Sequence, residues 1–172
     1  LKEGMTIQAV VDTERRQAIR RAHSATHLLH YALQQTLGGH AQQQGSKVDA
    51  DWLRFDFSNQ SGIDDDTLRK IEQIVNEKVN QAAPVVWNTV PLADARKAGA
   101  MMLFGEKYPD PVRMVSMGEF SKELCGGTHL HNTSEVKQFE IISEEGVSSG
   151  VRRIIALTGD RAHSHREWIQ ET

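Results

Sequence analysis

Two histidines and a Cys-His pair, separated by about a hundred residues, constrain the fold of this chain more than any other feature. His23 and His27 lie four residues apart in a helical pattern, so both imidazoles face one side, one turn (about 5.4 Å) apart. Cys125 and His129 are also four apart, with two glycines between them. One thiolate and three imidazoles suit Zn2+ in tetrahedral geometry. The pattern predicts a zinc site between the first helix and a glycine-rich loop; the alternative is a buried cysteine with unrelated histidines.

Five residues around these ligands bear on that prediction. Cys125 is the single cysteine of the 172 residues, so an internal disulfide is excluded and a buried thiol, a reactive thiol or a metal ligand remains. His30 adds an imidazole on nearly the same helical face, either supporting the site or lying at the surface. Gly126 and Gly127 can take positive φ and let the backbone come close to a ligand. Ser24 stands where a metalloprotease helix carries its glutamate, so the general base of that class is missing.

Hydrophobic periodicity divides the rest of the chain into mixed helices and strands. Apolar residues recur at three- and four-residue steps between positions 18 and 33, which is typical of an amphipathic helix. Leu53, Phe55 and Phe57 alternate with polar residues, as in a half-buried strand. Because strands and helices do not alternate regularly, the expected fold class is α+β, a mostly antiparallel sheet with helices packed on one face. We expect helices over 15–37, 64–83, 92–98 and 160–172, and strands over 5–11, 47–48, 53–57, 85–90, 112–117, 139–143 and 150–157.

The charge of the chain limits how it could hold a nucleic acid. A formal net charge of −3 leaves no overall positive field for a polyanion. Contacts to RNA would have to come from local groups, of which Arg20 with Arg21 and Arg152 with Arg153 are the candidates. Each pair has the alternative of a solvated helix face or strand end. No apolar run approaches the roughly 18–20 residues that a membrane helix needs.

Two segments resemble the signatures of a known family. The run His23–His30 (HSATHLLH) and the run Glu123–His129 (ELCGGTH) are similar to the two metal-binding segments of the alanyl-tRNA synthetase editing domain. This domain belongs to the threonyl/alanyl-tRNA synthetase second additional domain superfamily. The Cys-Gly-Gly-Thr-His form of the loop favours the alanine branch over the threonine branch. The resemblance runs from about residue 10 to 159. Further segments resemble the family and follow in the same order along the chain: 43–46, 53–57, 99–101, 103–108 and 150–154.

The resemblance implies a hydrolase that removes serine or glycine from mischarged tRNA for alanine, with zinc as cofactor. An alanine site cannot strongly reject glycine, which is smaller by one methyl group and loses only about 1–3 kcal/mol, and an apolar pocket cannot strongly reject serine, which adds only a hydroxyl. A hydrogen-bond partner for the serine hydroxyl would help, and Thr26 and Gln43 are the candidates. Their alternatives are a bond from Thr26 to its own helix and a solvent-facing Gln43. The N–H groups of Gly126 and Gly127 are candidates for stabilising the oxyanion.

The role of zinc and the surroundings of the domain stay open at this stage. Zinc could activate water or grip the α-amino group of the substrate, and four protein ligands favour the second role. A zinc-stabilised RNA-binding module without catalysis is the competing function. We expect an editing domain over 1–159, a helical tail over 160–172 leading to the next domain, and a cytoplasmic enzyme whose partners are tRNA and the remaining synthetase domains. A free-standing editing protein is the alternative to an excised domain. Ser134 and Lys137 depart from the family, which often has glycine there.

Overall fold

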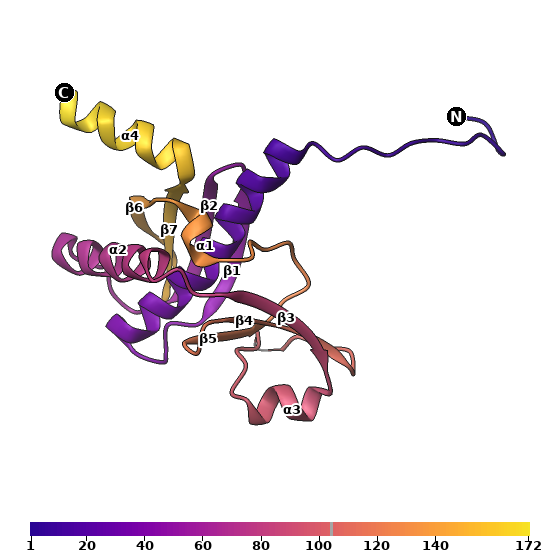
Figure 1. Cartoon of the computed structure of the whole chain (residues 1–172). Helices are drawn as coiled ribbons and strands as arrows, with labels where there is room; N and C mark the ends of the chain where they lie inside the picture. Colours follow the sequence, from indigo (N-terminus) through magenta and orange to yellow (C-terminus); the bar gives the residue numbers. More distant parts are fainter. Residues whose placement is uncertain (104) are drawn as a thin grey trace.

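The computed structural model describes residues 1–103 and 105–172, and it contains two antiparallel sheets around a long helix (Figure 1). The first sheet has the strand order β1-β2-β7-β6 and the second the order β3-β4-β5. The prediction of antiparallel strands with packed helices is confirmed, but the strands divide into two sheets. The strands are β1 (Gln43–Asp49), β2 (Trp52–Ser58), β3 (Val85–Val90), β4 (Val112–Met117), β5 (Ser121–Leu124), β6 (Phe139–Ser148) and β7 (Val151–Thr158); the helices are α1 (Thr13–Leu37), α2 (Asp65–Asn80), α3 (Leu92–Lys97), α4 (Gly159–Glu171) and a 3-10 turn, η1 (Thr133–Val136).

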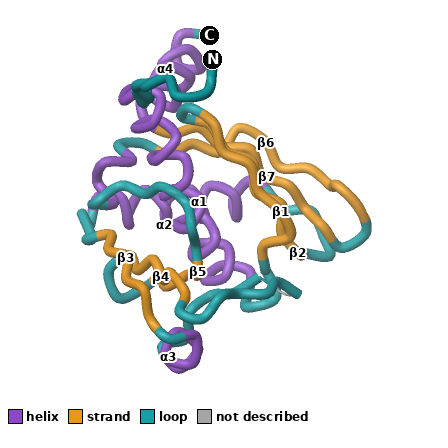
Figure 2. The backbone as a smooth tube through the Cα atoms, turned by 90° about the vertical axis from the view of Figure 1, so that its right-hand side faces the viewer, coloured by secondary structure: helices purple, strands orange, loops and turns teal. Residues whose placement is uncertain are grey.

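Helix α1 is the central element of the fold. Asp12 caps its first turn by accepting a hydrogen bond from the backbone N–H of Arg15, and the helix ends at Gly38, whose φ of 114° suits glycine. Small alanines such as Ala22 and Ala25 on its buried face let neighbouring elements approach closely. The helix contacts β2 and β7 of the first sheet and β5 of the second. Figure 2 shows the two sheets on different sides of α1.

The core forms where α1 and α2 cover the first sheet. Phe55 and Phe57 of β2 are fully buried, as their alternation predicts, and Phe55 pairs in register with Ile154 of β7. Asp64 precedes helix α2 and caps it by accepting the backbone N–H of Thr67. The helix buries an apolar stripe at Ile71, Val75 and Val79. Burying apolar area is the main stabilising contribution here, at roughly 25 cal/mol per Å².

Two departures from the expected elements have physical reasons. The predicted strand over 5–11 is wrong: residues 5–11 have no regular structure, and Ile7 and Val10 are exposed. Figure 1 shows this segment running away from both sheets, so it lacks a strand edge to bond with. Strand β5 was not expected because its inward positions are polar, Ser121 and Glu123, and polar residues carry no hydrophobic alternation.

The polar C-terminal segment forms a helix, as expected. Helix α4 buries only Gly159 and Ala162, and Figure 1 shows it projecting from the end of β7. It is fixed to the body by polar contacts, including an ion pair of 2.9 Å between Arg166 and Glu72 of α2. In the part of the chain that the structure describes, no helix combines the length and apolarity required to span a bilayer.

Candidate metal centre

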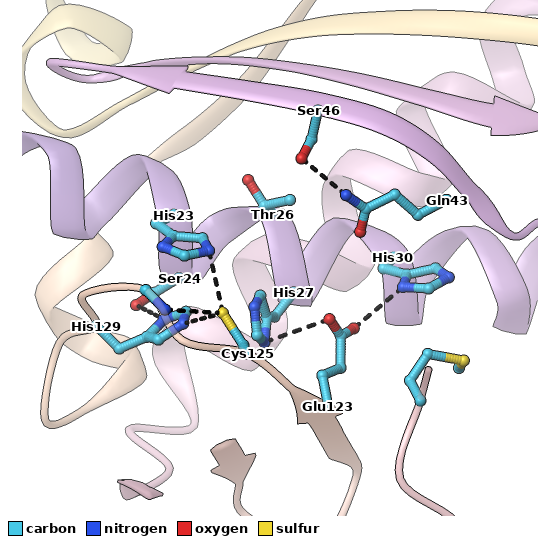
Figure 3. A network of polar contacts seen from close by, with 12 residues as sticks. His23, Ser24, Thr26, His27, His30, Gln43, Ser46, Glu123, Cys125 and His129 are labelled. Carbon is cyan, nitrogen blue, oxygen red and sulfur yellow. Dashed lines mark hydrogen bonds and ion pairs between the residues drawn. The ribbon is translucent and has the colours of Figure 1, made fainter. Parts of the chain in front are cut away.

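Four side chains from distant parts of the chain converge beside α1 (Figure 3). His23 and His27 come from the middle of α1, and Cys125 and His129 come from the loop that follows β5. One donor atom from each residue lies within 4.8 Å of the other three. The Sγ atom of Cys125 is 3.4 Å from Nε2 of His23 and 3.4 Å from Nε2 of His129. The structure thus brings all four expected ligands together, and the group could hold a metal ion.

An arginine that sequence reasoning missed ties the ligand loop to the second sheet. The Nη1 atom of Arg113, on β4, donates to the carbonyl oxygens of Cys125 and Gly127, both at 2.8 Å. The backbone N–H of Cys125 donates in turn to the carbonyl of Arg113 at 3.2 Å. The guanidinium also lies 5.0 Å from the ring centre of Trp87. The available signal was a cation among apolar residues in the strand predicted over 112–117, which calls for a nearby polar partner.

The two glycines of the loop differ in how closely they approach their neighbours. Neither Gly126 nor Gly127 has a positive φ, so that part of the prediction is wrong. A Cβ atom on Gly127 would lie 2.0 Å from Cε1 and 2.5 Å from Nδ1 of His23, whereas one on Gly126 would meet nothing within 4 Å. Gly127 is therefore required by the close passage of the backbone against the first histidine.

Hydrogen bonds orient the imidazole of His129. Its Nδ1 atom lies 3.0 Å from the hydroxyl of Ser24, which also accepts the backbone N–H of Leu130 at 3.1 Å. With Nδ1 directed at the serine, Nε2 is the nitrogen that faces Cys125. Such outer contacts select the tautomer of a ligating histidine. Ser24, which marks the absence of a metalloprotease base, here supports the ligand loop.

A buried carboxylate links His27, one of the four ligands, to a further histidine behind the centre. Glu123 places Oε1 3.1 Å from Nδ1 of His30 and Oε2 3.5 Å from Nδ1 of His27. The other nitrogen of His30, Nε2, lies 3.3 Å from the amide nitrogen of Gln34. His27 and His30 are 3% and 2% exposed. His30 therefore belongs to the surroundings of the site, not to the surface, and Glu123 is held between two imidazoles.

Burial sets the protonation of the four ligands. It lowers the pKa of His27 well below its ordinary value, and the neighbouring imidazoles and Arg113 act in the same direction. Burial, with His23 and Arg113, lowers the pKa of His129 to about 3. The pKa of His23 is lowered by burial, against a hydrogen bond with the backbone of Thr128. Burial raises the pKa of the Cys125 thiol. At neutral pH the imidazoles are uncharged donors, while the thiol must release its proton to a metal.

The centre opens into a small pocket lined by two further expected residues. The pocket has a volume of about 110 Å³, and its lining includes the side chains of Thr26, Gln43 and Ser46 together with three of the ligands. The hydroxyl of Thr26 donates to the carbonyl of Ala22 at 2.9 Å, which is the bond to its own helix that we weighed. The amide nitrogen of Gln43 donates to Ser46 at 2.7 Å. Both residues therefore lie beside the centre, with oxygen lone pairs still able to accept.

Comparisons with known proteins relate the chain to tRNA synthetases. A family described as "Threonyl and Alanyl tRNA synthetase second additional domain" matches residues 112–155. The chain is 64% identical over 170 residues to an alanine–tRNA ligase of Rhodopirellula baltica, a match that covers 99% of the chain and 18% of the ligase. It is 52% identical over 162 residues to an alanine–tRNA ligase of Burkholderia mallei, covering 94% of the chain and 18% of the ligase.

The chain belongs to the threonyl- and alanyl-tRNA synthetase second additional domain family. It spans about a fifth of the length of the curated alanine–tRNA ligases that it matches. The residues that match the family include β4 with Arg113 and the loop with two of the four metal-binding candidates, Cys125 and His129.

The arginines expected to contact tRNA lie elsewhere on this second additional domain. None of the four is in the lining of the metal pocket. Three form paired hydrogen bonds to carboxylates: Arg21 to Asp51 at 2.6 and 2.8 Å, Arg152 to Glu144 at 2.5 and 2.8 Å, and Arg153 to Asp56 at 2.7 and 3.0 Å. Among the described residues, the side chain of Arg20 makes a hydrogen bond only to Gln17, at 3.5 Å. Three of the four cations are thus already matched by an anion.

Proposed function

We propose that this domain hydrolyses the ester bond of tRNA for alanine that carries serine or glycine, with Zn2+ held by His23, His27, Cys125 and His129. The convergence of these donors beside a small pocket carries the proposal. The similarity of the chain to alanine–tRNA ligases supports it. A pocket of about 110 Å³ has room for a small aminoacyl group and little more. Such a step removes the errors that an alanine site cannot avoid by binding alone.

The donor set fits zinc. Bond lengths of about 2.0–2.1 Å to nitrogen and about 2.3 Å to sulfur, at tetrahedral angles, would separate N and S by about 3.6 Å. The observed separations of Cys125 Sγ from His23 and His129 are both 3.4 Å. A thiolate with neutral imidazoles is also the ligand chemistry that zinc prefers. Both measured separations thus match a zinc site, and the donor atom of His27 lies within 4.8 Å of the other three.

The residues of the chain have separable roles in this reaction. A zinc ion held by the four residues would supply a Lewis acid, and a fifth coordination position would let it hold the α-amino group of the substrate. Gly127 N–H is already directed at Cys125 Sγ, 3.4 Å away. Gly126 N–H makes no hydrogen bond among the described residues, so it is the donor available for the developing oxyanion. Thr26 and Gln43 would accept a hydrogen bond from the serine hydroxyl, which alanine lacks.

The remaining parts of the proposal concern the wider enzyme. The nucleic acid partner is the acceptor end of tRNA for alanine, and the protein partners are the other domains of a cytoplasmic alanyl-tRNA synthetase. Residues 1–159 form the editing unit, and 160–172, which contain most of α4, lead toward the next domain. Arg20 is the best placed of the four arginines for a phosphate, because the other three would have to leave their carboxylates.

Deacylation assays test the proposal directly. The domain is incubated with seryl-, glycyl- and alanyl-tRNA for alanine, with and without chelator, and Cys125→Ala is compared with the surface control Ser148→Ala. We expect rapid loss of serine and glycine, slow loss of alanine, and parallel loss of zinc and activity in Cys125→Ala only. Full activity after complete removal of the metal would exclude the zinc mechanism. A chelator that lowers Tm in a protein without any hydrolytic activity would favour the non-catalytic RNA-binding module instead.

A further inference from the structure

The metal pocket cannot contain the whole of a nucleoside ester. Its volume of about 110 Å³ is well below the roughly 300–1,000 Å³ that is usual for sites that bind compact organic ligands. If an aminoacyl group fills it, the sugar and base to which that group is attached must lie in an adjoining space. Where the structure offers such a space determines how the alcohol part of the substrate is held.

Two cavities adjoin the metal pocket and differ greatly in size. One, of about 80 Å³, shares Met101 and Glu123 with it. The other, of about 400 Å³, shares Gln43 and Leu103 with it. Only the second falls in the range of about 300–1,000 Å³ that is usual for binding sites of compact organic ligands. We call this second cavity the glutamine pocket; it is lined by Gln42–Gly45 and Ser58 on one side and by Leu103 and Glu106 on the other.

A bulge in β1 shapes the glutamine pocket. Gln43 pairs with Phe57 and Gly45 pairs with the next residue, Asp56, so Gln44 is an extra residue without a partner. Such bulges bend a strand and redirect a side chain. The strand lies at the edge of its sheet, so the bulge leaves polar backbone and a side chain beside the cavity, free of strand pairing.

The polar groups of the glutamine pocket suit an uncharged ligand with both donors and acceptors. The amide nitrogen of Gln42 donates to Gly39 O at 2.8 Å, and that of Gln43 to Ser46 at 2.7 Å. The exposed amide of Gln44 makes no hydrogen bond among the described residues. No lysine or arginine is in the lining, and Glu106 is acidic, so a phosphate group would be disfavoured here. Glutamine amides match the edge of adenine, which presents one donor beside one acceptor.

We infer that the glutamine pocket binds the terminal nucleoside of the esterified RNA, with the amide of Gln44 on the base or ribose, while the aminoacyl group occupies the metal pocket. The inference rests on the proposed function and adds the position of the nucleoside. The phosphates of the RNA then lie outside this cavity. The shared residue Gln43 separates the two parts of the substrate, with the ester bond beside it.

The test compares substrates with and without a nucleoside. The zinc-loaded domain, its Gln44→Ala variant and the control Gln73→Ala, an exposed glutamine on α2, are assayed with seryl-tRNA for alanine and with serine methyl ester. We expect Gln44→Ala to raise KM for seryl-tRNA about five- to tenfold, the effect of losing one neutral hydrogen bond. Its kcat for seryl-tRNA and its kcat/KM for the methyl ester should stay within about twofold of the wild-type values, and its Tm should equal the wild-type Tm within error.

A direct binding measurement keeps failure of the inference distinct from failure of the proposed function. The probe is adenosine carrying serine through a hydrolysis-resistant 3′-amide, titrated into the wild type, Gln44→Ala and Gln73→Ala. We expect binding to weaken about five- to tenfold in Gln44→Ala alone. Wild-type protein that hydrolyses no ester would overturn the proposed function, while this titration still decides the nucleoside site. Equal Kd and KM in the wild type and Gln44→Ala would overturn the inference, and so would an equal loss with the methyl ester.

Discussion

A single methyl group on Gly127 should disable the metal centre, whereas the same group on Gly126 should not. The new Cβ would lie 2.0 Å from Cε1 of His23, and carbon atoms need about 3.5 Å. The backbone of the loop or the imidazole must therefore move by about 1.5 Å. Metal–ligand distances tolerate only about ±0.2 Å, so the loop ligands and His23 cannot all stay on one ion. We expect zinc affinity to fall about 100-fold or more. Loss of a residue that only hydrogen-bonds to a metal ligand already lowers affinity by about 10- to 100-fold, and here the ligands themselves are displaced.

The matched variant and two measurements make this prediction sharp. Gly126→Ala adds the same methyl group where nothing lies within 4 Å and where φ is not positive, so its effect on stability should stay within about 0.5 kcal/mol. Zinc affinity is measured by competition with a chromophoric chelator, and thermal unfolding is followed in excess chelator. Gly127→Ala should also lose about 1–3 kcal/mol of metal-free stability through overpacking. Wild-type affinity in Gly127→Ala, or an equal loss in Gly126→Ala, would refute the reasoning from the close passage of the loop.

Three other predictions follow from the site and its surroundings. Zinc binding at pH 7 should release about one proton, because the raised pKa of Cys125 keeps the thiol protonated while the lowered pKa values of the imidazoles, about 3 for His129, leave them neutral. Zinc affinity should therefore rise about tenfold per pH unit below pH 8. Calorimetry of zinc binding in buffers of different ionisation enthalpy measures the proton release, and finding none would contradict this prediction. Gln43→Ala should slow hydrolysis of seryl-tRNA about five- to tenfold and change hydrolysis of glycyl-tRNA little. Equal rates for the wild type and Gln43→Ala on both esters would show that Gln43 does not recognise the serine hydroxyl. Lys137→Gly should stabilise the domain by about 0.5–1 kcal/mol, because Lys137 has a φ of 67° and its exposed ion pair with Asp160 contributes little; a lower Tm in thermal unfolding would show that the lysine is not strained.

Sequence alone determined most of the local elements and the identity of the candidate ligands. The apolar stripes of α1 and α2 and the alternation at Leu53, Phe55 and Phe57 predict their buried faces, because a periodicity of 3.6 or 2 follows directly from backbone geometry. The spacing of His23 and His27 predicts a shared helical face for the same reason. These features depend only on residues that are close in the sequence, so the local pattern of residues predicts them.

Only the tertiary structure decided which distant groups meet. Alternation does not specify a partner strand, so neither the division into two sheets nor the absence of a partner for residues 5–11 could be foreseen. The same holds for the carbonyl contacts of Arg113, the link from Glu123 to His30 on α1, and the carboxylates that neutralise Arg152 and Arg153. Each of these contacts depends on close packing between separate elements, and the requirement for glycine at position 127 exists only because His23 is packed against it.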